Sequence, residues 1–279
     1  MDRRLGGSLR GEEDREMTLP KISVVTPSFN QAPFLEETIR SVLSQGYPDL
    51  EYIVMDGGST DGSVDIIRKH AAGIAYWVSE PDAGQSDALC KGFSRATGDV
   101  FGWLNSDDTL RKGTLEKVGE YFRRHPKVDL MYGNVDIVDA SGGEMYTSYP
   151  MLDIRVLIYE NPFIPQQAMF WRRDLYDRVG GVNQKLRFAM DFELTVRFLL
   201  GGARVGKIPE VLANFRIHAG AKSSTIRNIM HAEIEEVLSR LCPTKDGALG
   251  RILKKMYYRC YRFYREPGSF FSAIKSRMH

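Results

Sequence analysis

The sequence predicts an α/β fold in which helices flank a mostly parallel, Rossmann-like central sheet, with a helical extension at the C-terminus. Through the first half of the 279 residues, short β-branched or apolar runs alternate with segments of helical periodicity, as in a parallel sheet covered by helices. Beyond residue 225 the pattern becomes helical and basic. The composition, 43% hydrophobic and 27% charged, is that of an ordinary globular chain long enough to bury a sizeable core.

The predicted elements follow one another regularly along the first half. Strands are expected at 22–26, 52–56, 74–78, 100–104 and 129–134, and helices near 33–44, 62–70, 85–95 and 114–124. Ser59, Thr60 and Asp61 are potential capping residues for the second of these helices. A hairpin is expected around Gly142-Gly143, and a further helix at 191–200.

The pattern divides the chain into a disordered leader (1–19), an α/β domain (20–225) and a basic helical extension (226–279). The leader is charged and lacks the apolar run of a secretory signal, and no apolar stretch approaches the roughly 20 residues that span a bilayer. The three cysteines, Cys90, Cys242 and Cys260, suit neither a disulfide framework nor a zinc site. A reducing, cytoplasmic location is therefore expected. With a formal net charge of +2, nucleic acid is not an expected partner.

Polar or acidic residues follow each of the first four predicted strands. They are Thr26-Pro27-Ser28, Asp56-Gly57-Gly58, Ser79-Glu80-Pro81-Asp82 and Asn105-Ser106-Asp107-Asp108. In an open α/β sheet the ligand crevice lies outside the carboxyl ends of the strands. Each loop alone also fits an ordinary turn or helix cap, but the four together favour one acidic, hydroxyl-lined binding cleft.

The last of these loops is the most informative. Carboxylates packed as closely as Asp107 and Asp108 repel each other unless a cation or a proton joins them. A hard divalent ion such as Mg²⁺ or Mn²⁺ suits oxygen ligands and also bridges diphosphate oxygens. We therefore assign Asp107 to a metal ion, and leave Asp108 as a supporting residue or as a cap for the turn at Thr109.

Several segments, taken in order, resemble family 2 glycosyltransferases, which have the GT-A fold. They are VVTPSFNQAPFLEETIRSVLSQ, IVMDGGSTDGS, SEPDAGQSDALCKGF and FGWLNSDD, followed by IPQQAMFWRRDLYDRVGG, AMDFELTVRF and FRIHAGAKSS. The likeness extends from about Pro20 to Ser224. It implies a transfer of sugar, with inversion, from a nucleotide-diphosphate sugar to an acceptor hydroxyl, expected on a glycan or a lipid-linked saccharide.

The resemblance also implies roles for individual residues. Donor binding is implied for Thr26, Pro27, Ser28, Asp56, Gln85, Asp87, Asn105 and Ser106. Asp107 occupies the metal position of the family's DxD motif, whose first aspartate is Asn105 here, and His218 matches a position that contacts the metal or the diphosphate. Asp191 matches the catalytic base. Without the resemblance, Asp191 could equally be a favourable charge at a helix N-terminus.

Two other functions remain open. A sugar-1-phosphate nucleotidyltransferase would use a similar sheet and ion, but would need a glycine- and arginine-rich phosphate loop where Thr26-Pro27-Ser28 stands. A catalytically silent nucleotide-sugar-binding subunit is favoured by Asn105 and disfavoured by the presence of Asp107 and Asp191. The stretch at 201–207 is similar to a P-loop, but Ile208 stands where the magnesium-binding hydroxyl would be.

The C-terminal tail, 247–279, is basic and aromatic. It contains eight lysines and arginines against Glu266 alone, with aliphatic and aromatic residues between them. Such a helix fits peripheral contact with anionic lipid at the inner face of the membrane. The alternative is a helix packed on the domain with a solvated basic face.

Overall fold

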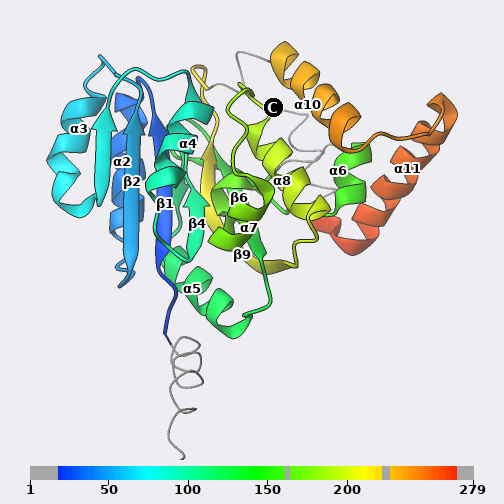
Figure 1. The fold of residues 1–279 in the computed structure, drawn as a ribbon, viewed down its shortest axis with the longest axis horizontal. Coiled ribbons are helices and arrows are strands. Elements are labelled where there is room, and N and C mark those ends of the chain that lie inside the picture. Colours follow the sequence, from blue (N-terminus) through cyan, green and yellow to red (C-terminus); the bar gives the residue numbers. More distant parts are fainter. Residues whose placement is uncertain (1–17, 161–163, 222–226, 269–279) are drawn as a thin grey trace, which may run out of the picture.

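The computed structural model describes residues 18–160, 164–221 and 227–268 and contains a curled sheet with helices on both faces (Figure 1). The strand order is β3-β2-β1-β4-β8-β6-β9-β5, with β7 paired to β6. This confirms the predicted α/β class with its central sheet, flanking helices and helical C-terminal segment. The predicted leader lies outside the described residues, apart from Thr18 and Leu19.

The first half alternates strands and helices as predicted. Its elements are β1 (Ile22–Ser28), α2 (Ala32–Leu43), β2 (Leu50–Asp56), α3 (Ser63–His70), the 3₁₀ turn η1 (Ala71–Gly73), β3 (Tyr76–Ser79), α4 (Gln85–Arg95) and β4 (Val100–Trp103). The central strand β1 pairs in parallel with β2 and β4, and β2 pairs in parallel with β3. The carboxyl ends of these four strands therefore lie at one edge of the sheet.

The second half of the sheet is mixed. It comprises β5 (Thr109–Leu110), α5 (Thr114–Arg124), β6 (Leu130–Val138), β7 (Glu144–Ser148), α6 (Ile154–Glu160), the 3₁₀ turn η2 (Gln166–Ala168), β8 (Met169–Arg172), α7 (Arg173–Val179), α8 (Met190–Leu200) and β9 (Val205–Arg216). The predicted hairpin joins β6 and β7. Strand β8 runs antiparallel to both β4 and β6, while β9 is parallel to β6. Strand β9 thus ends at the same edge as β1 to β4.

The two faces of the sheet bury separate apolar cores. One includes Val25, Phe93 and Trp171 and lies under α4, α7 and α8; the other includes Val24 and Ile39 and lies under α2, α3 and α5. Adjacent residues of β1 face opposite cores because side chains alternate along a strand. The sheet is consequently a rigid base for loops that leave its edges.

Two helices close the described chain, α10 (Arg227–Leu241) and α11 (Ala248–Arg265). Helix α10 packs against α8, with Ile234 and Val237 in the same buried core as α8. Helix α11 lies against α6 (Figure 1). No helix in the described part of the chain is both long and apolar enough to cross a membrane.

Candidate active site

The carboxyl ends of β1, β2, β3, β4 and β9 bring most of the predicted site residues to one edge of the sheet. Thr26, Pro27 and Ser28 end β1 and are buried there. The Thr26 hydroxyl accepts a hydrogen bond of 3.1 Å from the Tyr52 hydroxyl. The Ser28 hydroxyl is buried and has no hydrogen-bond partner among the described residues. A buried hydroxyl without a partner is uncommon and suggests a ligand or water contact.

Asp56 ends β2 directly beside Ser28 in the strand register. Its carboxylate accepts hydrogen bonds from the Ser59 amide (2.9 Å), the Ser59 hydroxyl (2.6 Å) and the Ser79 hydroxyl (2.7 Å). The Gly58 amide also points to it at 3.2 Å, and Gly58 has a φ of +83°, a conformation that glycine adopts without strain. Asp56 therefore fixes the shape of the loop that follows β2.

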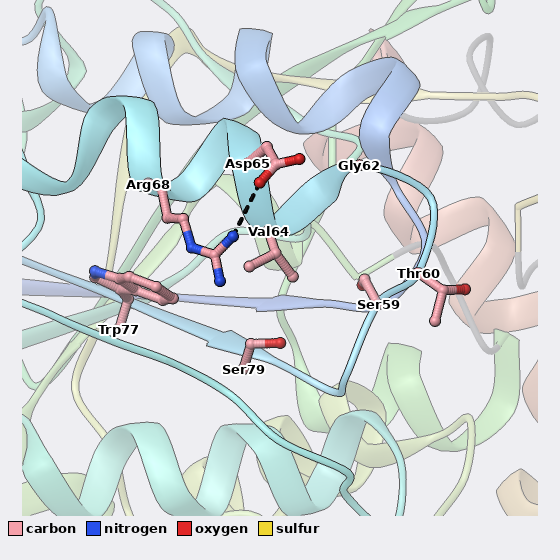
Figure 2. Close-up of a pocket in the computed structure, with 8 residues that line it drawn as sticks. All are labelled: Ser59, Thr60, Gly62, Val64, Asp65, Arg68, Trp77 and Ser79. Atoms are coloured by element: carbon pink, nitrogen blue, oxygen red, sulfur yellow. Dashed lines mark hydrogen bonds and ion pairs between the residues drawn. The ribbon is translucent and has the colours of Figure 1, made fainter.

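A pocket of about 510 Å³ lies between this loop, α3 and β3 (Figure 2). Figure 2 shows Arg68 of α3 paired with Asp65 of the same helix, with Trp77 and Ser79 of β3 and Ser59 of the loop also lining the pocket. Both serines bind Asp56, so a ligand that displaced them would also disturb the Asp56 carboxylate. Trp77 is half-buried because β3 is an edge strand.

The second helix begins differently from the prediction. Its N-cap is Gly62, without a side-chain cap. Asp61 instead spans two helices, accepting from the amide of Ala32 in α2 (2.9 Å) and from the amide of Ser63 in α3 (3.1 Å). Ser59 likewise accepts from the Asn30 amide at 2.8 Å. These residues tie the start of α2 to the start of α3, beside the site edge.

Helix α4 starts at the predicted donor residues. Gln85 donates from Nε2 to Asn105 Oδ1 at 2.8 Å. Asp87 accepts from the Ala83 amide (3.1 Å), pairs with Lys91 (3.0 Å) and accepts from Gln184. The Ala83 amide, followed by Lys91 and Gln184, lowers the pKa of Asp87. Asp87 therefore stabilises the N-terminus of α4 as a carboxylate, in addition to its predicted donor role.

Asn105 is the centre of a half-buried amide network. It accepts from Trp103 Nε1 at 2.7 Å and from Gln85, and its Nδ2 donates to Gln166 Oε1 at 3.2 Å and to Asp108 Oδ2 at 3.4 Å. An aspartate here could not donate and would face the Asp108 carboxylate. The Asn105 amide therefore uses both its oxygen and its nitrogen in this network.

Asp107 and His218 meet although 111 residues separate them. The distance from His218 Nε2 to Asp107 Oδ2 is 3.2 Å, and the side chains are 9% and 19% exposed. The His218 ring lies 4.4 Å from the Phe34 ring of α2, measured between centroids. The two residues meet because Asp107 follows β4 and His218 follows β9, and both strands end at the same edge of the sheet.

Asp107 and His218 fit a site for a divalent cation whose coordination is completed by a bound substrate. Among the described residues, no three His, Cys, Asp or Glu side chains converge as a ready-made ligand set. Mg²⁺ is commonly held by one or two carboxylates together with substrate phosphates and water. One partly exposed carboxylate and one imidazole match a site of this kind, with few protein ligands, better than a structural metal centre.

Asp108 is not the turn cap that we considered possible. Thr109–Leu110 forms the strand β5, and Asp108 Oδ1 instead accepts from the Arg216 amide of β9 at 3.0 Å. Asp108 is fully buried, and this burial, with the adjacent charge of Asp107, raises the pKa of its carboxyl well above the usual value. Asp108 therefore holds the backbone of β9, while Asp107 contacts His218.

Arg216 is a site residue that the sequence analysis missed. It is 3% exposed, donates to the Asp107 carbonyl oxygen at 3.0 Å, and pairs with Glu37 of α2 at 2.6 Å. Its guanidinium also lies 5.2 Å from the Phe34 ring centroid. Arg216 thus fixes the Asp107 backbone and the end of β9 that carries His218. The only sequence signal was an arginine two residues before His218.

Asp191 is the second residue of α8 and is half-buried. Its Oδ1 accepts from the neighbouring Phe192 amide at 2.7 Å. Glu193, two residues on, is 2% exposed and pairs with Arg197 (2.6 Å) and Arg240 (3.0 Å), so it has a structural role. The loop before α8 contacts the site helix α4, because Ser86 donates to the Leu186 carbonyl oxygen.

Glu233 of α10 anchors the start of α8. Its carboxylate accepts from the amides of Arg187, Phe188 and Ala189, each at 2.8 Å. These amides belong to the N-cap Ala189 and the two residues before it, and a negative charge beside a helix N-terminus is favourable. A residue in the C-terminal segment therefore positions the backbone that presents Asp191.

We expect Glu233→Ala to lower the free energy of unfolding by about 2–3 kcal/mol, because three amides lose a charged acceptor. Urea unfolding measures this change. Glu235→Ala is the matched control, since Glu235 is exposed on the same helix. Equal stability of the two variants would show that Glu233 does not anchor α8.

Comparison with known proteins agrees with this architecture. Residues 23–183 match the sequence model of glycosyl transferase family 2. The chain is 31% identical over 214 residues to a PGL/p-HBAD biosynthesis glycosyltransferase of Mycobacterium bovis, covering 75% of this chain and 82% of that one. It is 32% identical over 184 residues to an uncharacterized glycosyltransferase of Mycobacterium tuberculosis, covering 65% and 70% respectively.

Solved structures give the same fold at lower identity. S. aureus TarS, residues 1–349 in complex with UDP-GlcNAc, superposes with a TM-score of 0.64 at 18% identity, covering 88% of this chain and 73% of that one. The mannosyltransferase PcManGT from Pyrobaculum calidifontis, in complex with GDP-Man and Mn²⁺, gives 0.58 at 18% identity, covering 94% and 85%.

The sheet topology, the residues gathered at its carboxyl edge and these likenesses together define a glycosyltransferase with the GT-A fold. The chain belongs to glycosyl transferase family 2, as its resemblance to that family implied.

Proposed function

We propose that the protein transfers a sugar from a nucleotide-diphosphate sugar to an acceptor hydroxyl by a metal-assisted inverting displacement. The observation that carries the proposal is the meeting of Asp107 and His218 at the edge where β1 and β2 also end. The nucleoside is proposed to lie against Thr26, Pro27, Ser28 and Asp56. The buried hydroxyl of Ser28, with no partner among the described residues, supports a donor contact there.

Asp107 and His218 would hold Mn²⁺ or Mg²⁺ together with the donor diphosphate. Such an ion, when bound, neutralises the negative charge that develops on the leaving diphosphate. Gln85, Asp87, Asn105 and Ser106 are proposed to border the donor on the α4 side. The hydrogen bonds from Gln85 to Asn105 and from Gln184 to Asp87 hold this wall in place before the donor binds, which limits the reorganisation needed at the transition state.

Asp191 is proposed as the general base. Its carboxylate would accept the proton of the attacking acceptor hydroxyl while the bond between the anomeric carbon and the diphosphate oxygen breaks. A base placed in this way contributes about 10²–10⁴-fold to the rate. Its half-buried position at the start of α8, on a backbone held by Glu233, suits a group that needs both access and a fixed position.

We further propose a glycan or lipid-linked saccharide as the acceptor, and contact between residues 247–279 and the inner face of the membrane. The three cysteines are free thiols, in keeping with a reducing compartment. Membership of a glycosyltransferase family argues against the nucleotidyltransferase alternative. Nucleic acid is not a proposed partner.

A thermal-shift screen of nucleotide-diphosphate sugars with Mn²⁺ or Mg²⁺ tests the proposal. A donor present at about 100 times its Kd should raise the free energy of unfolding by about 2.7 kcal/mol, and only with the ion present. The stabilising donor should then release its nucleoside diphosphate slowly in water. Pyrophosphate release from a nucleoside triphosphate and a sugar phosphate, without any effect of nucleotide sugars, would contradict it.

A further inference from the structure

Helix α11 is attached to the domain through its polar and aromatic side. Tyr258 stacks on Tyr159 of α6 with ring centroids 5.2 Å apart, and Arg155 lies 5.5 Å from the Tyr261 ring centroid. Arg259 and Arg262 each approach the buried Glu160 carboxylate at 3.6 Å. These contacts fix which face of α11 is turned away from the protein.

The outward face of α11 is apolar. Its exposed apolar side chains include Leu249 (70%), Ile252 (57%), Leu253 (58%), Met256 (61%) and Tyr264 (84%). They follow Leu249 by three, four, seven and fifteen residues, which places them in one stripe along the helix. A surface helix of a globular protein normally turns such a stripe toward the core. Here the arrangement is reversed, so the stripe is available to a partner.

The charge around the stripe identifies the kind of partner. The sequence of α11 contains six lysines and arginines and no acidic residue. Lys254, Arg259 and Arg262 pair with acidic residues outside the helix, whereas Arg251 and Lys255 are exposed. By helical spacing these two lie on the side of α11 away from the stripe, so the helix combines an apolar face with a basic one. Such a helix complements a bilayer surface, where acyl chains lie below anionic headgroups. A second copy would present the same positive helix in a symmetric contact, and the like charges would repel.

We propose that α11 docks the protein on anionic membranes, with the stripe of Leu249, Ile252, Leu253, Met256 and Tyr264 inserted between the headgroups. The domain stays attached through the Tyr159 and Glu160 contacts of α6. The inference deepens the proposed function, on which its purpose rests, because a docked enzyme would meet an acceptor carried by a lipid. Docking itself does not depend on catalysis.

Co-sedimentation of the full-length protein with vesicles tests the docking. The vesicles are phosphatidylcholine with or without phosphatidylglycerol. We expect binding only to the anionic vesicles, weakened by salt. Leu253→Glu and Lys255→Glu should each lower the vesicle partition coefficient, by about tenfold for Leu253→Glu and about fivefold for Lys255→Glu.

Each variant has a matched control elsewhere on the surface. Leu200→Glu makes the same change at a leucine of similar exposure, 51%, and Lys127→Glu does so at another exposed lysine. Both controls should bind vesicles as the parent does. Absence of binding to anionic vesicles, or equal binding by Leu253→Glu and Leu200→Glu, would overturn the proposal.

Sedimentation equilibrium without lipid tests whether the partner of the stripe is a second copy of the protein. A dimer that Leu253→Glu dissociates would make a second copy the partner and would also overturn membrane docking. The donor-induced thermal shift is measured on the same variants. It should stay at the parental value, so that failure of docking and failure of the proposed transferase activity are distinguished.

Discussion

Asp191→Asn should reduce the rate of sugar transfer by about 10²–10⁴-fold, the usual contribution of a general base. An asparagine has nearly the same shape, and its oxygen can still accept from the Phe192 amide, as Asp191 does at 2.7 Å. The start of α8 should therefore remain folded, and donor binding should be retained. Single-turnover transfer gives the rate, and the donor-induced thermal shift gives the binding.

Asp174→Asn is the matched control for this substitution. Asp174 also lies in the first turn of a helix, α7, and is exposed. The Asp174→Asn variant should transfer sugar at the parental rate. Parental transfer by Asp191→Asn would mean that Asp191 only contributes a favourable charge at the helix N-terminus, which is worth about 1 kcal/mol or less.

Asp107→Ala should abolish the metal-dependent part of donor binding, with at least about 100-fold weaker affinity in the presence of Mn²⁺. Loss of residues that only support a metal ligand already costs about 10–100-fold. The fold should survive, since Arg216 binds the backbone carbonyl oxygen of residue 107 and not its carboxylate. Donor titration with and without Mn²⁺, followed by thermal shift, measures the effect.

Asp177→Ala controls for the loss of one negative charge. The Asp177 side chain is 60% exposed on α7 and pairs with Arg173. The donor affinity of this control variant should change with Mn²⁺ as that of the parent does. If Mn²⁺ changed the donor affinity of Asp107→Ala as much as that of the parent, the ion would not be bound by Asp107.

The sequence allowed the first half of the fold to be predicted closely. Helices α4 and α5 begin and end at the predicted residues, and the first four strands pair in parallel. Local signals suffice here, because each strand is followed at once by the helix that covers it. The same regularity placed four polar loops at one edge.

The second half depends on pairings between distant residues. Strand β8 separates β4 from β6 in the sheet, and nothing in its four residues specifies that place. Two features of the site share this origin. Arg216 supports Asp107 from 109 residues away, and Glu233 supports the start of α8 from more than 40 residues away. The residues resembling the family motifs were visible in the sequence, whereas the residues that hold them in position were not.

The outward stripe of α11 illustrates a further limit. The composition of 247–279 permitted either a helix packed on the domain or a helix on a membrane. The structure shows packing through Tyr258 and Arg262, and this leaves the apolar face outside. Which face of an isolated helix is buried follows from its neighbours, here α6, and these cannot be inferred from periodicity alone.

A crystal structure with the stabilising donor and Mn²⁺ tests the central claim most directly. The account predicts that Asp107 and His218 both contact the ion, that the ion contacts the donor diphosphate, and that the Asp191 carboxylate faces the anomeric carbon from the side opposite the diphosphate. A donor bound elsewhere, with Asp107 turned away from both ion and diphosphate, would contradict it.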